Sequence, residues 1–254
     1  MNDKNFDVDF LLNTGDSNMV DDNIEAKIGN FQFNRQVAQH FDAHIRKSVP
    51  FYDEIHRMIV EMSDWFIYKN CIIYDLGTST GEAIKNLWLR HRMYKNPKFI
   101  GIDNSKHMLE IARQKLKGMD NISLEYNDLN NGINIHDASL VLLLYVLQFV
   151  RPGKRQNLIQ NIYDGLHDNG AMLLVEKVVG NNPMFNEMWI ELYQDMKLRN
   201  GLTLEQIKAK AESLRSVAIN YSQDKNAQLL EGAGFKYIDV FFKWYNFIGF
   251  IAVK

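Results

Sequence analysis

Between residues 71 and 175, five short strand-like segments alternate with segments of helical periodicity. The strand-like segments cover residues 71–74, 99–102, 122–126, 140–144 and 171–175. Segment 140–144 is apolar at every position, as expected for a parallel strand that is covered on both faces. Strands separated by helices in this way predict a doubly wound parallel sheet of the α/β class.

The flanking parts of the chain complete this pattern. Residues 31–51 and 51–66 have helical spacing and predict a helical cap before the first strand. A helical insertion is expected at about 180–234, followed by a hairpin-like pair of strands at 236–243 and 246–253. A sheet of seven strands in this order predicts a Rossmann-like fold of the class I methyltransferase type.

The size of the chain fits one domain. Its 254 residues, of which 46% are hydrophobic, can bury a single core of ordinary size. We expect residues 29–254 to form that domain, and the polar residues 1–28, rich in Asp and Asn, to form a disordered tail. The single cysteine, Cys71, excludes an internal disulfide framework and is typical of a reducing compartment.

Charge and hydropathy limit the partners and the location. With 29 basic and 31 acidic residues, the chain lacks the global basic excess that holds a nucleic-acid backbone. A local basic cluster is more typical of a solvated helix end than of a tRNA site, so direct nucleic-acid binding is not expected; it comprises Lys85, Arg90, Arg92, Lys95 and Lys98. The longest apolar stretch, 138–150, is too short to span a bilayer, and the N-terminus lacks the apolar region of a secretory signal. We therefore expect a cytoplasmic protein without a membrane contact.

A glycine turn joins the first predicted strand to the helix that follows it. In the sequence Tyr-Asp-Leu-Gly-Thr-Ser-Thr-Gly of residues 74–81, Gly77 and Gly81 permit a sharp turn and close approach of a ligand. Asp103 ends the second strand, where a carboxylate can accept both hydroxyls of an adenosine ribose. Asp128 follows the third strand and is placed to accept the adenine amino group. These positions predict a nucleoside that lies across the carboxyl ends of neighbouring strands.

The same turn discriminates between nucleoside ligands. A dinucleotide fingerprint needs three glycines, and Ser79 and Glu82 occupy the second and third of these positions. Without that bare backbone a pyrophosphate is poorly held. The turn therefore favours an adenosyl ligand without phosphate, and S-adenosylmethionine is such a ligand, with S-adenosylhomocysteine as the product of methyl transfer.

Several motifs together resemble those of the carboxy-S-adenosylmethionine synthase family. The similarity runs from about residue 31 to the C-terminus through Phe31-x-Phe33, Val37-Ala38-x-x-Phe41, Ser48-Val49-Pro50-x-Tyr52, Tyr74-Asp75-Leu76-Gly77, Ile102-Asp103-Asn104-Ser105, Leu147-Gln148-Phe149, Gly170 through Glu176-Lys177, Lys197 with Asn200-Gly201, and Asn246-Phe247. The resemblance implies a class I methyltransferase fold and a homodimer. It also implies the synthesis of a carboxylated S-adenosylmethionine from prephenate, for modification of the wobble uridine of tRNA.

The resemblance also implies which residues bind the cofactor. Together with the neighbours of the glycine turn, the expected cofactor-binding set is Tyr52, Asp75, Gly77, Thr78, Ser79, Gly81, Asp103, Asn104, Met108, Asp128, Leu129 and Leu144. The aromatic side chain of Tyr52 is suited to face the sulfonium, because aromatic rings stabilise a positive charge.

Two positions depart from the family pattern. The family has an arginine that grips the extra carboxylate of the product, and the matching residue here is Ala211; the nearest arginine, Arg215, lies one helical turn further on. The family has an asparagine where this chain has Leu144. Loss of a guanidinium that binds a carboxylate is not conservative. These departures favour methyl transfer to a small-molecule acceptor as the activity, with carboxy-S-adenosylmethionine synthesis as the alternative and a non-catalytic cofactor-binding partner as a third possibility.

The acceptor side of the site is less clearly marked. Tyr145, at the end of the fourth strand, is a candidate general base, and His44, Tyr193 and Arg199 are candidate substrate contacts. His40 and His44 share a helix face, but without further ligands their spacing favours surface or capping histidines over a metal site. We therefore expect no metal.

Overall fold

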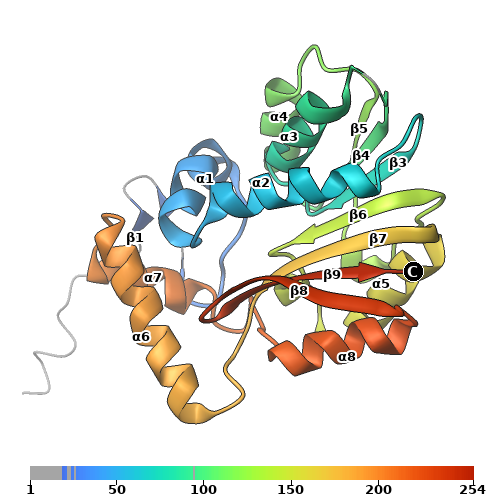
Figure 1. Cartoon of the computed structure of the whole chain (residues 1–254). Coiled ribbons are helices and arrows are strands. Elements are labelled where there is room, and N and C mark those ends of the chain that lie inside the picture. Colours follow the sequence, from blue (N-terminus) through green and yellow to red (C-terminus); the bar gives the residue numbers. More distant parts are fainter. Residues whose placement is uncertain (1–18, 22–23, 26, 94) are drawn as a thin grey trace, which may run out of the picture.

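The computed structural model describes residues 19–21, 24–25, 27–93 and 95–254 (Figure 1). Its main sheet has seven strands, the number that the sequence predicts, and their order across the sheet is β5-β4-β3-β6-β7-β9-β8. The pairs among β3 to β7 are parallel, whereas β9 pairs antiparallel with both β7 and β8. The strands are β3 Ile72–Leu76, β4 Lys98–Asp103, β5 Ile122–Tyr126, β6 Ala138–Leu144, β7 Leu166–Lys177, β8 Tyr237–Trp244 and β9 Phe247–Val253.

Helices cover both faces of this sheet, and strand β6 shows why they do. Leu140 and Leu142 belong to the core cluster that includes apolar residues of α2, α3 and α4. Val141 and Leu143 belong to the cluster on the other face, which includes apolar residues of α5 and α8. Alternate side chains of a strand point to opposite faces of the sheet. The apolar segment of β6 therefore buries side chains on both faces. These helices are α2 Tyr52–Met62, α3 Glu82–His91, α4 Lys106–Lys115, α5 Pro152–Gly165 and α8 Gln223–Ala233.

The N-terminal segment corrects the expectation of a disordered tail. Residues Met19–Asp21 (β1) and Ile24–Glu25 (β2) pair in a small antiparallel sheet that contacts α1 (Arg35–Ser48) and α7 (Leu204–Ser213). The side chains of Val20 and Ile24 are fully buried in an apolar cluster with residues of α1 and α4. These two apolar side chains pack the segment against the helices. The polar average composition of residues 1–28 did not indicate this packing. Residues 1–18 of the expected tail lie outside the described residues.

The expected helical insertion divides into two parts. Helices α6 (Pro183–Arg199) and α7 lie beside the sheet with α1, whereas α8 packs on the sheet against α5 (Figure 1). Leu230 and Ala233 of α8 belong to the core cluster of that face, so α8 is part of the sheet's cover. Across the described ranges, no helix has both the length and the apolar character that crossing a bilayer requires.

Candidate functional site

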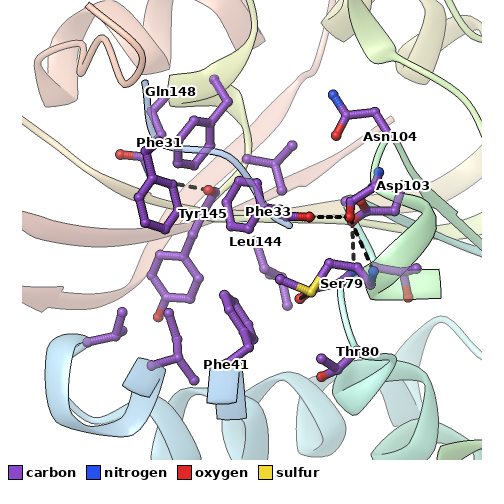
Figure 2. A pocket seen from close by; sticks show the side chains of 18 of the residues that line it. Phe31, Phe33, Phe41, Ser79, Thr80, Asp103, Asn104, Leu144, Tyr145 and Gln148 are labelled. Carbon is purple, nitrogen blue, oxygen red and sulfur yellow. Dashed lines mark hydrogen bonds between the residues drawn. The ribbon is translucent and has the colours of Figure 1, made fainter. Parts of the chain in front are cut away.

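A cavity of about 780 Å³ opens at the carboxyl ends of the parallel strands. Its wall includes the turn after β3, the end of β4 and the segments that follow β5 and β6. Figure 2 shows Asp103, Asn104 and Ser79 on one side of this space and Tyr145 on the other, with the rings of Phe33 and Phe41 between them. Ligands of open α/β sheets bind at this edge, so the predicted location of the site matches the cavity.

The glycine turn has the tight geometry that its sequence suggests. Gly77 has a φ of +76°, and a Cβ added there would lie 2.3 Å from Cγ2 of Val146. Ser79 also has a positive φ, +53°, although it is not a glycine. Thr78 Oγ1 donates a hydrogen bond of 2.7 Å to Asp75. Burial raises the pKa of the Asp75 carboxyl to about 7, and its bond to Thr78 ties the turn to β3.

Asp103 is held with acceptor capacity to spare. Its Oδ2 accepts a hydrogen bond of 2.9 Å from Ser79 N, and its Oδ1 accepts one of 2.8 Å from Ser105 N (Figure 2). Burial raises the pKa of this carboxyl above its usual range. A carboxylate offers about four acceptor positions, more than these backbone bonds occupy. Asp103 can therefore also accept bonds from ribose hydroxyls, and the residues present fit an adenosyl group.

The far side of the cavity is aromatic. Tyr145 has a φ of +61°, and its buried hydroxyl has no hydrogen-bond partner among the described residues. Its ring stacks on that of Tyr52 with 6.5 Å between the centroids. Glu176 of β7 fixes the backbone after Tyr145 by accepting a bond of 2.7 Å from Leu147 N. Burial raises the pKa of Tyr145 well above its ordinary value, so this phenol keeps its proton near neutral pH and can donate a hydrogen bond.

His44 is not the surface or capping residue that its spacing suggested. Its Nδ1 lies 2.8 Å from Asp21 Oδ2 and its Nε2 lies 3.1 Å from Ser48 Oγ, all three side chains being buried. Burial lowers the pKa of His44 to about 4, so the imidazole is neutral near pH 7. It lines the cavity, as expected of a substrate contact. Within the described ranges, no group of His, Cys, Asp or Glu side chains is arranged to hold a metal ion.

Most of the expected site residues come together in this cavity. Of the cofactor-binding set, all residues except Gly81 line it. Gly81 instead begins α3 with a φ of +79°, where a Cβ would lie 2.9 Å from Leu116. Tyr193 lines the cavity and donates a hydrogen bond of 2.7 Å to the carbonyl of Ser48. Arg199 is exposed outside it, because a residue six positions after Tyr193 lies on another face of α6.

Three lysines of the wall were missed as site residues. Lys177, Lys197 and Lys210 all line the cavity, and Lys197 is only 8% exposed. Lys197 follows Tyr193 by four residues, a spacing that places both side chains on one face of a helix. The sequence alone could have predicted this position. Lys177 belongs to a motif that resembles the family, but that motif did not assign it to the site. No local pattern marks Lys210, because its approach to the cavity depends on how α7 packs.

The basic cluster noted in the sequence lies on the surface, in local pairs. Arg90 Nη2 lies 2.6 Å from Asp64 Oδ2, Lys85 lies 3.6 Å from Glu82, and the guanidinium of Arg92 covers the ring of Trp88 at 4.8 Å. Such pairs are typical of a solvated helix face.

Comparison with known proteins identifies the family. Residues 73–170 match the model of a methyltransferase domain. A carboxy-S-adenosyl-L-methionine synthase of Methylococcus capsulatus is 43% identical over 89% of this chain and 95% of its own length. Proteins of the same name from Staphylococcus epidermidis and Helicobacter pylori are 40% and 36% identical over 86% and 88% of this chain, and over 94% of their own lengths.

Solved structures show the same fold at lower identity. A Methanococcus maripaludis protein described as a putative S-adenosyl-L-methionine-dependent methyltransferase has a TM-score of 0.59 at 17% identity, covering 90% of this chain and 96% of its own. Human N-acetylserotonin methyltransferase in complex with S-adenosylmethionine has a TM-score of 0.57 at 17% identity, covering 87% of this chain and 55% of its own. S-adenosylmethionine is the substrate or cofactor of such proteins. This chain has a class I methyltransferase fold and belongs to the carboxy-S-adenosyl-L-methionine synthase family.

Proposed function

We propose that this protein is a carboxy-S-adenosyl-L-methionine synthase, which transfers the ring carboxyl group of prephenate, as carbon dioxide, to the methyl carbon of S-adenosylmethionine. A methyl proton and the ring hydroxide of prephenate leave together as water, and the remainder of prephenate leaves as phenylpyruvate. The observation that carries the proposal is one cavity with Asp103 and Asp128 at the strand ends and three lysines elsewhere in its wall. The acids suit an adenosyl group with a cationic sulfonium, and the lysines suit an organic acid. The relatives at 36–43% identity, which carry this name, support the same activity.

The side chains of this cavity have distinct tasks in that reaction. Asp103 binds the ribose hydroxyls, and Gly77 lets the turn pack closely against Val146. When bound, S-adenosylmethionine supplies a methyl group that its sulfonium activates. Tyr145 offers a hydrogen-bond donor to the reacting groups. The rings of Phe31, Phe33 and Phe41 cover the cavity and keep water from the site.

Methyl transfer to a small molecule, the first expectation from the sequence, becomes the second candidate. One observation favours it. Ala211, which stands where the family has its carboxylate-binding arginine, lines the cavity without contributing a charge. Leu144, in place of the family's asparagine, adds an apolar contact to the same wall.

The test is product analysis with a labelled carboxyl group. Purified protein is incubated with S-adenosylmethionine and prephenate that carries ¹³C in the carboxyl group attached to its ring. The nucleosides are then separated, and their masses are measured by mass spectrometry. We expect carboxy-S-adenosylmethionine that carries the label, none when prephenate is omitted, and much less when Asp103 is replaced by Ala. Unlabelled S-adenosylmethionine after long incubation with folded, cofactor-binding protein would contradict the proposal. S-adenosylhomocysteine formed only with another acceptor would favour methyl transfer.

A further inference from the structure

Three elements bring lysines to the same cavity wall. Lys177 ends β7, Lys197 lies on α6 and Lys210 lies on α7. The ammonium nitrogens of Lys177 and Lys197 lie 4.6 Å and 4.0 Å from the centroid of the Tyr193 ring. The ammonium nitrogen of Lys210 lies 3.3 Å from the ring centroid of Phe31, which also lines the cavity. The three cations therefore meet aromatic rings at the wall of one space.

Among the residues that the structure describes, these ammonium groups have no acidic partner. In the described part of the chain, no carboxylate oxygen lies within the 4.0 Å of an ion pair from any of the three ammonium groups. Asp21 acts on Lys210 only through a longer-range attraction, and it is already bonded to His44 and Lys47. Lys197 is buried, and Lys177 and Lys210 are half-buried. A cation withdrawn from water without a partner is costly, and neighbouring cations add mutual repulsion.

The pKa values of all three lysines are lowered, as this cost predicts. Burial lowers the pKa of Lys177 to about 8. Burial, with repulsion from Lys177, lowers the pKa of Lys197 to about 7. The pKa of Lys210 is lowered well below its ordinary value, by burial and by the charge of Lys197. A ligand with negative charge would remove the penalty at all three positions.

The rest of the cavity indicates where such a ligand lies. The rings of the wall residues Tyr193 and Phe247 pack edge to face, with 5.1 Å between their centroids. The ring centroids of Phe247 and Tyr145 lie 6.3 Å apart. This row of rings connects the lysines to the aromatic side of the cofactor cavity. Ala211, next to Lys210 in the sequence, leaves its part of the wall without a guanidinium.

We infer that Lys177, Lys197 and Lys210 form the binding site for the carboxylates of the second substrate, a small dicarboxylic acid. In this role their ammonium groups supply positive charge to a wall in which Ala211 contributes none. The inference rests on the proposed function for the identity of the reaction. The three lysines then determine which organic acid binds, and Asp103 binds the adenosyl group.

The test measures binding, with no product formed. The protein is saturated with S-adenosylhomocysteine, which has no methyl group to carboxylate, and prephenate is titrated into it in a calorimeter. Lys197→Met and Lys210→Met are compared with the unchanged protein, and Lys208→Met is the control because Lys208 is exposed on the same helix as Lys210. Phenylpyruvate, with one carboxylate, is titrated as the monoanionic probe.

We expect each of the two cavity variants to weaken prephenate binding about tenfold or more, because each removes one charged partner of a carboxylate. The control variant and Lys197→Arg should stay within about threefold of the unchanged protein, and phenylpyruvate should bind more weakly than prephenate. Unchanged affinity for S-adenosylhomocysteine shows that the variants are folded. Should a variant fail that check, Lys177→Met and Lys197→Gln give the same comparison.

The outcome is independent of whether the proposed reaction occurs. Lysine-dependent binding of prephenate supports the inference even if no carboxylated cofactor is made, in which case only the proposed function fails. Equal prephenate affinity in the unchanged protein and both cavity variants overturns the inference, even if carboxylated product forms.

Discussion

Ser79 N donates a hydrogen bond of 2.9 Å to Oδ2 of Asp103, which joins the turn after β3 to the end of β4. Ser79 is in the left-handed backbone region, and this bond stabilises that conformation. The carboxylate that is expected to bind the ribose thus also holds the turn that approaches the ligand. The two halves of the adenosyl site form one unit.

Replacing Asp103 by Ala should weaken S-adenosylhomocysteine binding about 10- to 100-fold. The change removes the acceptor of the ribose hydroxyls, and hydrogen bonds to a charged group contribute about 1.5–3 kcal/mol. Calorimetric titration measures the effect. Glu125→Ala, an exposed acid on the neighbouring strand β5, is the control and should leave the affinity unchanged. Unaltered affinity in Asp103→Ala would remove Asp103 from the site.

Gly77→Ala tests the close approach at the turn. The added Cβ would lie 2.3 Å from Val146 Cγ2, and it would also sit on a residue with a φ of +76°. We expect a loss of about 1–3 kcal/mol in the free energy of unfolding, together with weaker cofactor binding.

Gly118→Ala separates strain from collision. Gly118 has a φ of +84°, but nothing lies within 4 Å of an added Cβ. Its replacement carries the backbone strain alone and should cost less than Gly77→Ala, with cofactor affinity intact. Urea denaturation and calorimetry give both values, and an equal loss in the two variants would refute the steric account.

Tyr145→Phe should raise the stability of the ligand-free protein and reduce activity. The Tyr145 hydroxyl is buried without a partner in the described residues, and an unsatisfied buried polar group costs about 1–3 kcal/mol. If that hydroxyl donates to a bound ligand, the variant should lose turnover or prephenate affinity while keeping the Tyr145 ring contacts. Thermal denaturation and product assays check both parts. A less stable variant with full activity would contradict this role.

Lys197 gives the stability a defined pH dependence. Its pKa falls to about 7 in the folded protein from an ordinary value of 10.5. Between these values the unfolded chain holds a proton that the folded chain has released, so the unfolding free energy from this group rises with pH and is lowest below about pH 7. The lowered pKa values of Lys177 and Lys210 act in the same direction. The pKa of His44, lowered from 6.5 to about 4, makes stability rise with pH only between those two values.

The Lys197→Met variant isolates that contribution. Its gain in stability over the unchanged protein should be largest below about pH 7 and should shrink as the pH rises toward 10. Urea denaturation of both proteins at several pH values measures this difference. Parallel stability curves would show that Lys197 has an ordinary pKa in the fold.

The features that the sequence predicts depend on local patterns, whereas the missed features depend on contacts between residues far apart in the sequence. The seven strands and the positions of Asp103 and Asp128 could be predicted, because strand periodicity and the order of strands place them at one edge. The pairing of His44 with Asp21 could not, since the partner lies 23 residues away in a segment of polar composition. Arg199, a candidate substrate contact, is exposed outside the cavity, whereas Lys197 on the same helix lines it.

The most direct test is a crystal structure of the protein with S-adenosylhomocysteine and prephenate together. We expect the ribose hydroxyls on the carboxylate of Asp103 and the carboxylates of prephenate within ion-pair distance of Lys197 and Lys210. An empty cavity, or an adenosyl group bound away from Asp103, would contradict the account.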